Sequence, residues 1–379
     1  MSRIHKIRVI PLRYQFDASA AYGSARGLTT GRGGSIVILE TEDGIEGIGE
    51  AWGPGAVSLG YLELLKPHYI GASVHAVRGI AQSILARSYH MGTQNQMISL
   101  MGGIDIAAHD AIGKIFGVSV AELIGGRLRE RVPVYASGGY FTADADHEAA
   151  LARQLEQLGN KGHGAYKIKI GRHPEEDAAR VALARRIIGE KALLTVDSNG
   201  NYTVDGVIES MRRIAEFGIH WYEEPLAPQD WAGYGELARK SPIALATGEA
   251  LYGVFDFRRA IDNRLVAVLQ PDLTLCGGFD VARTVGALCG VEHLRLSPHC
   301  WGTGVGLAAA LQFMAALPAY PHAANVPYPA LLEYDVGNNA LRDEIFVEPL
   351  HYVAGCLEVP PGPGLGVTLN QAALKRFAA

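Results

Sequence analysis

The sequence has 379 residues, of which 48% are hydrophobic and 19% charged, and its formal net charge is −5. A chain of this length exceeds one ordinary hydrophobic core, so we expect two domains. The mild acidity argues against nucleic acids and membrane surfaces as partners. The four cysteines form no paired CxxC motif, and no apolar run has the length of a signal peptide core or a membrane span, so we expect a cytoplasmic protein.

The first 130 residues mix strand and helix patterns. Strands come first, with an Asp43-Gly44 pair that is a strong hairpin signal. Helical spacing begins at about Leu62. The predicted elements are strands over 6–14 and 33–52, and helices over 97–117 and 119–127.

Residues 131–340 show eight short β-rich runs that alternate with amphipathic helices, a pattern typical of parallel βαβ units. Eight units close most readily into a TIM-type barrel. A doubly wound open sheet is the alternative, but no GxGxxG follows the first strand. Residues 341–379 return to short strands and a Pro/Gly turn, which we expect to pack on the N-terminal domain. The predicted barrel strands are 132–139, 165–171, 193–200, 220–226, 243–250, 267–273, 294–300 and 323–329.

Three acids follow consecutive strands at the spacing of one βα unit. Asp197, Glu223 and Glu249 are each 26 residues from the next. A barrel places such residues at the same C-terminal rim, where converging carboxylates need a hard cation such as Mg²⁺. Each acid is alternatively a helix N-cap or a solvated loop charge. Glu223 and Glu249 are poor N-cap types, however, and capping does not predict the shared period.

The stretch "KIKIG" puts Lys167 and Lys169 on one side of a strand, because residues two apart face the same way. Both side chains then point into the barrel mouth. A neighbouring ammonium lowers the pKa of a lysine, and a neutral amine can remove a proton. The alternative is a pair of structural lysines that form salt bridges with the three acids.

Further candidates follow the later strands. His299 is placed across the mouth from the lysines, and Asp272, 27 residues earlier, could hydrogen-bond one ring nitrogen and fix its tautomer. Glu333 follows the last predicted strand and could donate a hydrogen bond to a substrate carboxylate if it stays protonated. The alternatives are a polar core histidine and a surface acid.

A Mg²⁺ ion, a lysine base and an opposed histidine suit removal of the proton α to a carboxylate. The barrier is the enediolate, which metal contacts can stabilise. Returning a proton to the other face gives racemisation. Protonating a β-leaving oxygen gives elimination.

The motifs "KIKIG", "VDSNGN", "WYEEPL", "TGEA", "LQPDL" and "SPHCWGTGVG" resemble the enolase superfamily, mandelate racemase subgroup. The resemblance covers essentially the whole chain. It implies a modified TIM barrel, (β/α)7β, over 131–340, with an α+β capping domain from 1–130 to which 341–379 returns. It also implies Asp197, Glu223 and Glu249 as ligands of one Mg²⁺, Lys169 as base, Lys167 as carboxylate contact, His299 with Asp272 as the opposite acid/base, and Glu333 as a carboxylate-binding residue.

Within that subgroup, "LCGGF", "PHCWGTGVGLAAALQFMAA" and "LLEYDVGNNALRDEIF" are most similar to acid-sugar dehydratases and galactarolactone cycloisomerase-like enzymes. This resemblance implies β-elimination from an acid sugar: dehydration, or opening of a lactone or anhydro sugar. A racemase or epimerase of a 2-hydroxy acid using the same Lys/His pair remains open, as does a non-catalytic barrel protein. We expect a homo-oligomer, since closed symmetric assemblies are common.

Two stretches rich in Gly, Ser and aromatics, 13–27 and 51–58, are typical of mobile lids. Ordinary loop composition explains them equally well. Asn199 and Glu224 lie beside predicted ligands and could assist the site. The candidate substrate contacts are Asn199, Tyr14, Tyr22, Arg26 and Trp52, with His90, Gln94 and Asn95 as weaker candidates.

Overall fold

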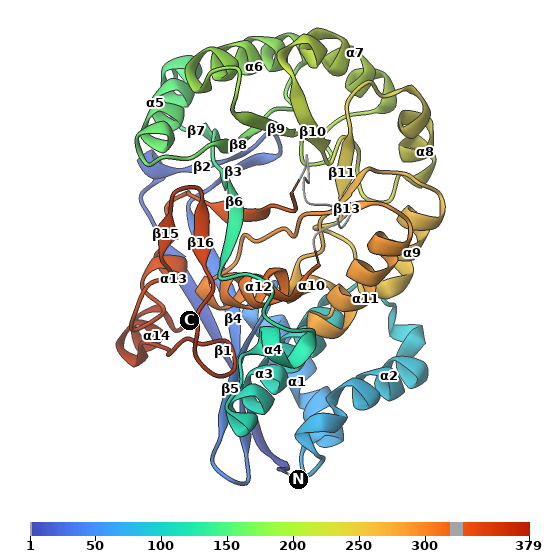
Figure 1. Ribbon diagram of the computed structural model, residues 1–379, viewed down its shortest axis with the longest axis vertical. Coiled ribbons are helices and arrows are strands. Elements are labelled where there is room, and N and C mark those ends of the chain that lie inside the picture. The colour runs from blue at the N-terminus through green and yellow to red at the C-terminus, as the bar shows by residue number, and fades with distance from the viewer. Residues whose placement is uncertain (1, 319–328) are drawn as a thin grey trace.

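The computed structural model describes residues 2–318 and 329–379, which form a cap and a barrel (Figure 1). The cap holds an antiparallel sheet in the order β1–β4–β5, against which its helices pack. Among the described residues, no helix is long and apolar enough to cross a membrane. The cap elements are β1 (Ile4–Gln15), β4 (Gly31–Thr41), β5 (Glu46–Ala51), α1 (Gly55–Tyr69), α2 (Val77–Ser88), α3 (Gln96–Phe116) and α4 (Val120–Ile124).

Glycines let α3 approach the cap sheet closely. A Cβ at Gly47 or Gly49 of β5 would lie 2.0 or 2.1 Å from a backbone oxygen of α3, so only glycine fits at these positions. The predicted helix over 97–117 matches α3, which ends where Gly117 takes a φ of 69°. The first cap helix begins at Gly55, earlier than the sequence pattern indicated.

Eight parallel strands form the barrel, which confirms the predicted fold. The last strand, β14, pairs with the first, β6. Two hydrogen bonds join the β14 region to the β13 region: Glu333 N–H donates to Pro298 O at 3.2 Å, and Ser297 Oγ donates to Leu331 O at 2.6 Å. Together with the β6–β14 pairing, these bonds close the barrel and exclude an open sheet. The strands are β6 (Arg131–Ser137), β8 (Ala165–Lys169), β9 (Leu193–Asp197), β10 (Ile219–Glu223), β11 (Leu245–Thr247), β12 (Val268–Leu269), β13 (Arg295–Leu296) and β14 (Leu332–Asp335).

The eighth strand lies later in the chain than predicted. The expected run, 323–329, falls almost wholly outside the described residues, and the strand that closes the barrel is β14. Glu333 is therefore inside the last strand and not after it. Its side chain points into the barrel interior, where it is buried.

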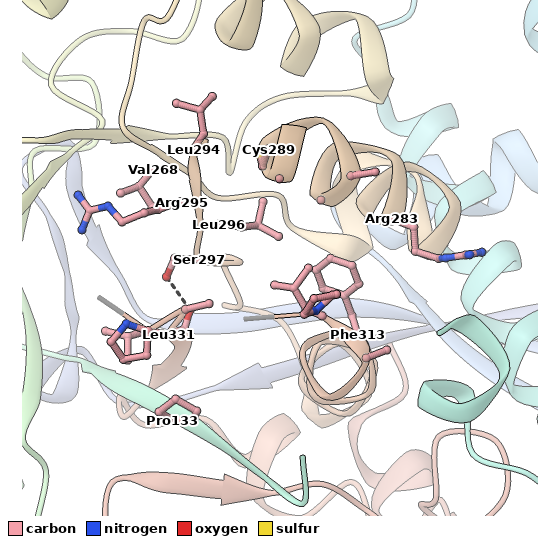
Figure 2. Close-up of a pocket in the computed structure, with 18 of the residues that line it drawn as sticks. Pro133, Val268, Arg283, Cys289, Leu294, Arg295, Leu296, Ser297, Phe313 and Leu331 are labelled. Carbon is pink, nitrogen blue, oxygen red and sulfur yellow. Dashed lines mark hydrogen bonds between the residues drawn. The ribbon is translucent and has the colours of Figure 1, made fainter. Parts of the chain in front are cut away.

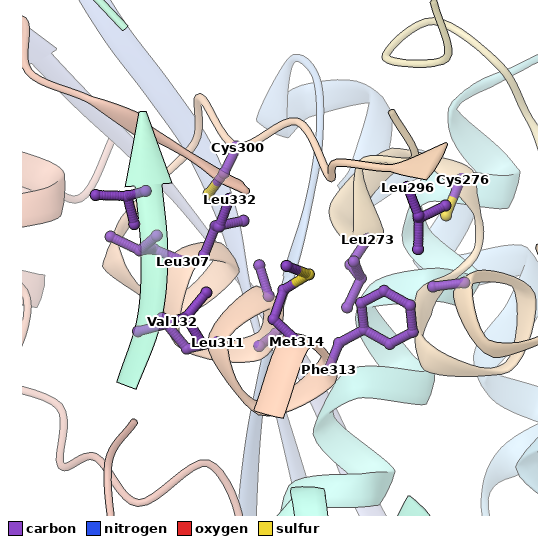
Figure 3. Packing of buried hydrophobic residues seen from close by; sticks show 14 of the residues in the cluster. Val132, Leu273, Cys276, Leu296, Cys300, Leu307, Leu311, Phe313, Met314 and Leu332 are labelled. Carbon is purple, nitrogen blue, oxygen red and sulfur yellow. The ribbon is translucent and has the colours of Figure 1, made fainter. Parts of the chain in front are cut away.

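Helices surround the barrel (Figure 1). The last of them, α12, is buried along almost its whole length between the barrel and the cap. Figure 3 shows its side chains Leu307, Leu311 and Met314 packed toward Val132 of β6 and Leu332 of β14. The helices are α5 (His147–Asn160), α6 (Pro174–Ile188), α7 (Val204–Ile214), α8 (Trp231–Lys240), α9 (Gly253–Asp262), α10 (Leu273–Cys276), α11 (Gly278–Val291) and α12 (Gly304–Ala316).

The C-terminal segment contacts both the barrel and the cap. After α13 (Ala340–Asp343), strands β15 (Tyr352–Val353) and β16 (Cys356–Glu358) extend the barrel sheet next to β6. The final helix, α14 (Gln371–Phe377), then packs on β1 of the cap.

The stretches expected as lids contain regular structure. In 13–27, residues 13–15, 22–24 and 27 are in strands, and β2 (Tyr22–Ser24) pairs with β3 (Gly27–Thr29) and with β7 (Phe141–Thr142), which follows barrel strand β6. In 51–58, only residues 52–54 lie outside β5 and α1.

Candidate active site

Strand β8 carries two buried lysines into the barrel mouth. Lys167 Nζ lies 2.7 Å from Glu333 Oε1 and 3.6 Å from Asp197 Oδ2, and it also contacts the Glu223 carboxylate. Lys169 Nζ contacts the Asp197 carboxylate. Each buried ammonium therefore has a carboxylate partner, as buried charges require.

These pairs raise the pKa of both lysines. Burial acts to lower the pKa of Lys169, but the Asp197 carboxylate outweighs burial and holds that pKa above its ordinary value. Glu223 and Glu333 do the same for Lys167, whose pKa is held well above its ordinary value against the effect of burial. The predicted lowering of the lysine pKa is therefore wrong for this arrangement, because the carboxylates outweigh the second ammonium.

The three predicted acids converge. Asp197 ends β9, Glu223 ends β10 and Glu249 follows β11, and their ligand oxygens lie within 4.8 Å of one another. Burial raises the pKa of Glu223 to about 7 despite the Lys167 ammonium beside it. Three carboxylates at this distance repel one another unless a cation lies close to them. Carboxylate oxygens are ligands that suit a hard divalent cation.

Neighbouring donors fix the direction of two of these acids. Glu223 Oε2 accepts hydrogen bonds from Trp221 Nε1 at 3.1 Å and Gln270 Nε2 at 2.7 Å. Asp197 Oδ1 accepts one from the backbone N–H of Asn199 at 2.7 Å. One oxygen of each carboxylate is thus held by the protein, as outer partners hold ligands in metal sites.

Asp272 and His299 form a dyad on the opposite side of the mouth. His299 Nδ1 donates to Asp272 Oδ2 at 2.7 Å, and His299 Nε2 lies 3.5 Å from Glu249 Oε2. Asp272 Oδ1 accepts from Thr274 N at 2.8 Å, so this acid also caps α10. Burial acts to lower the pKa of His299, but Glu249 and Glu333 raise it to about 10.

Glu333 is ionised. Burial acts to raise its pKa, but Lys167 and His299 lower it to about 2. Its Oε2 also accepts from the Cys300 N–H at 3.3 Å. The expectation that Glu333 stays protonated and donates to a substrate is wrong here, because two cations face it.

Some predicted substrate contacts lie at this site. The Trp52 ring centroid is 6.4 Å from that of His299. Asn199 donates from Nδ2 to Glu224 Oε2 at 3.4 Å, and both residues take positive φ, 46° and 38°. Non-glycine residues held in that region store strain, and such positions cluster at functional sites.

The remaining candidates point elsewhere. The Tyr14 hydroxyl donates to Asn338 Oδ1 at 3.0 Å, and its ring packs on Phe377 near the C-terminus. Arg26 is exposed in the turn between β2 and β3. The weaker candidates have structural contacts: His90 stacks on Tyr89, Asn95 caps α3, and Gln94 donates to Asp256 of α9.

A buried ion pair above the site was not predicted. Arg32 of the cap lies 2.9 Å from Asp335, stacks 3.6 Å above the Trp301 ring and donates to the Tyr22 hydroxyl at 2.8 Å. Tyr140 donates to Asp335 Oδ1 at 2.8 Å. Strand periodicity could have identified Asp335, because it lies two residues after Glu333 and faces the same way.

The fold and the site together define a capped α/β-barrel enzyme whose buried acids and bases meet at the carboxyl ends of the strands. Residues 150–373 match the family described as "Enolase C-terminal domain-like". Residues 25–125 match the mandelate racemase / muconate lactonizing enzyme N-terminal domain. The chain belongs to the enolase superfamily, and it is an enzyme of the lyase or isomerase type.

Three relatives illustrate this relationship. The chain is 35% identical over 375 residues to D-galactarolactone cycloisomerase of Agrobacterium fabrum, which covers 99% of this chain and 98% of the relative. The crystal structure of 3,6-anhydro-D-galactonate cycloisomerase from Zobellia galactanivorans superposes with a TM-score of 0.89 at 29% identity and covers 100% of both chains. A racemase from Streptomyces coelicolor with bound magnesium superposes with a TM-score of 0.87 at 28% identity, covering 99% of this chain and 100% of the racemase.

Proposed function

We propose that this enzyme uses Mg²⁺ to remove the proton α to the carboxylate of an acid sugar and then eliminates a β-oxygen. One observation carries the proposal: Lys169 contacts Asp197 at one end of the carboxylate cluster, and His299 faces Glu249 at the other. An acid/base group thus stands on each side of a cation-binding centre. The relatives named for acid-sugar cycloisomerisation support the substrate class.

The donor set fits a magnesium ion. Asp197, Glu223 and Glu249 would hold it, since all three offer carboxylate oxygens and a lysine ammonium already lies against two of them. Once bound, the ion supplies positive charge to the substrate carboxylate, where negative charge builds as the proton leaves.

The side chains of the protein perform the proton transfers. Lys169 and His299 lie where they can reach opposite faces of the α-carbon, and the face that carries the C–H bond decides which of them takes the proton. The C–H electron pair first passes toward the substrate carboxylate, and it forms the new C=C bond when the β C–O bond breaks in the following step. The other group then protonates the leaving oxygen. Asp272 holds the His299 ring in the tautomer and orientation that this step needs.

A substrate screen tests the proposal. Hexarates, hexonates and their lactones are incubated with enzyme and Mg²⁺, and 2-keto-3-deoxy or ring-opened products are followed. We expect product with at least one of these compounds and none after chelation of the metal. No product from the whole set would contradict the proposal. Exchange of the α-hydrogen with deuterium from solvent, without net elimination, would favour a racemase or epimerase instead.

A further inference from the structure

Glu50, the next-to-last residue of β5 in the cap, is fully buried and binds the first turn of a barrel helix. Its carboxylate accepts hydrogen bonds from Thr303 N at 2.9 Å, Thr303 Oγ1 at 2.6 Å and Gly306 N at 2.7 Å. These donors belong to the N-terminus of α12, where unpaired N–H groups favour an anion. A residue of the capping domain thus supplies the acid that binds the N-terminus of a barrel helix.

The chain leaves room for this carboxylate on three sides. A Cβ at Gly302 would lie 2.3 Å from Glu50 Oε1, and one at Gly306 would lie 2.9 Å from Oε2. A Cβ at Gly34 of β4 would lie 3.0 Å from Oε1. Two segments distant in sequence, β4 and the start of α12, therefore carry three glycines where they meet one acid, which indicates a built contact.

The end of β5 contacts the segments that carry both members of the Asp272–His299 dyad. The Glu50 contact holds the segment 299–303, which carries His299. Two residues further on, Trp52 N–H donates to Thr274 O at 3.0 Å, and Thr274 in turn donates to Asp272. The Trp52 ring also lies against the His299 ring.

We propose that Glu50 is a positioning residue that couples docking of the cap to the placement of the Asp272–His299 dyad. Its kinetic effect rests on the proposed function, whereas its structural effect does not. Nothing in the proposed proton transfers requires Glu50 to touch substrate or metal.

The kinetic test compares two steps. Exchange of the α-hydrogen and formation of product are measured separately for His299→Asn and Lys169→Ala, which shows the step that each group serves. Glu50→Gln keeps the size of the side chain but places an amide N–H₂ against donor groups. We expect it to slow the step served by His299 by about 10–100-fold, since small misplacements have effects of this size. The step served by Lys169 should stay within about threefold of wild type, and Mg²⁺ affinity should not change.

Asp110 is the matched control. It is an equally buried cap acid, and it accepts from Ile48 N at 2.8 Å, Leu365 N at 2.7 Å and Lys114 Nζ at 2.7 Å, away from the dyad. Asp110→Asn should lower Tm but leave both steps within about threefold of wild type. If Glu50→Gln slows both steps equally, or slows neither, the positioning role is overturned.

An NMR measurement separates this inference from the proposed function. In histidine-labelled protein, Glu50→Gln should shift or broaden the ring signals of His299 and leave those of His163 unchanged. Unmoved His299 signals would overturn the inference even if the enzyme is active. If wild type acts on no acid sugar, the proposed function fails and the His299 signals still decide the inference. Should Glu50→Gln fail to fold, Thr303→Val removes one of the three hydrogen bonds and should move the same signals by less.

Discussion

Both ends of the barrel bury histidines, with opposite effects on their pKa. At the carboxyl ends of the strands, the pKa of His299 is raised to about 10. At the amino ends, burial lowers the pKa of His163 and of His220 to about 4. Burial disfavours the charged ring in all three cases, and the neighbouring cations Lys161 and Arg295 add to this effect at His163 and His220, respectively. At His299 the carboxylates of Glu249, Glu333 and Asp272 outweigh burial.

A cavity of about 650 Å³ lies at the amino ends of the strands, where Leu294, Leu296 and Phe313 line it (Figure 2). Ser297 there donates its hydroxyl to Leu331 O at 2.6 Å. The acids, lysines and dyad all lie at the other end. Concentrated and mutually paired charge therefore distinguishes the carboxyl ends of the strands from the cavity at the amino ends.

The largest expected effect is at the reactive end. Lys169→Ala removes a proposed acid/base group, so kcat/KM on the acid sugar found by the screen should fall by at least about 10³-fold, or about 4 kcal/mol. Steady-state kinetics with saturating Mg²⁺ measure this loss, and circular dichroism checks the fold. Activity within tenfold of wild type would remove Lys169 from the mechanism.

The dyad gives the next effect. Asp272→Asn can still cap α10 through its side-chain oxygen, but an amide no longer holds the His299 tautomer as a carboxylate does. We expect kcat to fall by about 10²-fold, about 3 kcal/mol, with little change in Tm. A large loss of Tm with unchanged kcat would show that Asp272 serves the helix alone.

The reactive end was largely predictable because its residues share a simple rule. One polar residue per βα unit, plus the two-residue period of a strand, places Asp197, Glu223, Glu249 and the two lysines at one rim. The rule depends only on spacing along the chain, so it can be applied without knowing which distant residues come into contact.

Other features depend on contacts distant in sequence, which spacing cannot show. Arg32 pairs with Asp335 and Glu50 with Thr303, in each case joining the cap to the barrel. The protonation of Glu333 was predicted wrongly for the same reason, because Lys167 and His299 reach it from other strands. The last strand was expected too early in the chain: the run 323–329 contains Pro327 and Pro329, which disfavour a central strand, whereas β14 contains no proline.

At the cavity end, a substitution should affect stability and spare catalysis. Leu294→Ala enlarges a space that is already present, and we expect the free energy of unfolding to fall by about 2 kcal/mol. Chemical denaturation measures this loss, while kcat should stay within about threefold of wild type. If kcat falls as steeply as stability, the two ends are coupled and the contrast between them fails.

The smallest effect tests the contrast in histidine pKa directly. His163 packs 4.4 Å from the Tyr352 ring, and its Nδ1 has no hydrogen-bond partner among the described residues. The pKa of His163 is lowered to about 4 in the folded protein, whereas its ordinary value in the unfolded chain is about 6.5. Between these two pH values, the unfolded chain binds the proton more readily than the folded protein does. Stability from a neutral His163 is thus present above about pH 6.5 and is lost as the pH falls toward 4. The unfolding free energy of wild type minus that of His163→Phe should fall by on the order of 1 kcal/mol over this range, allowing for solvent screening. A difference that stays flat with pH would mean that the pKa of His163 is not lowered in the folded protein, and the contrast with His299 would fail.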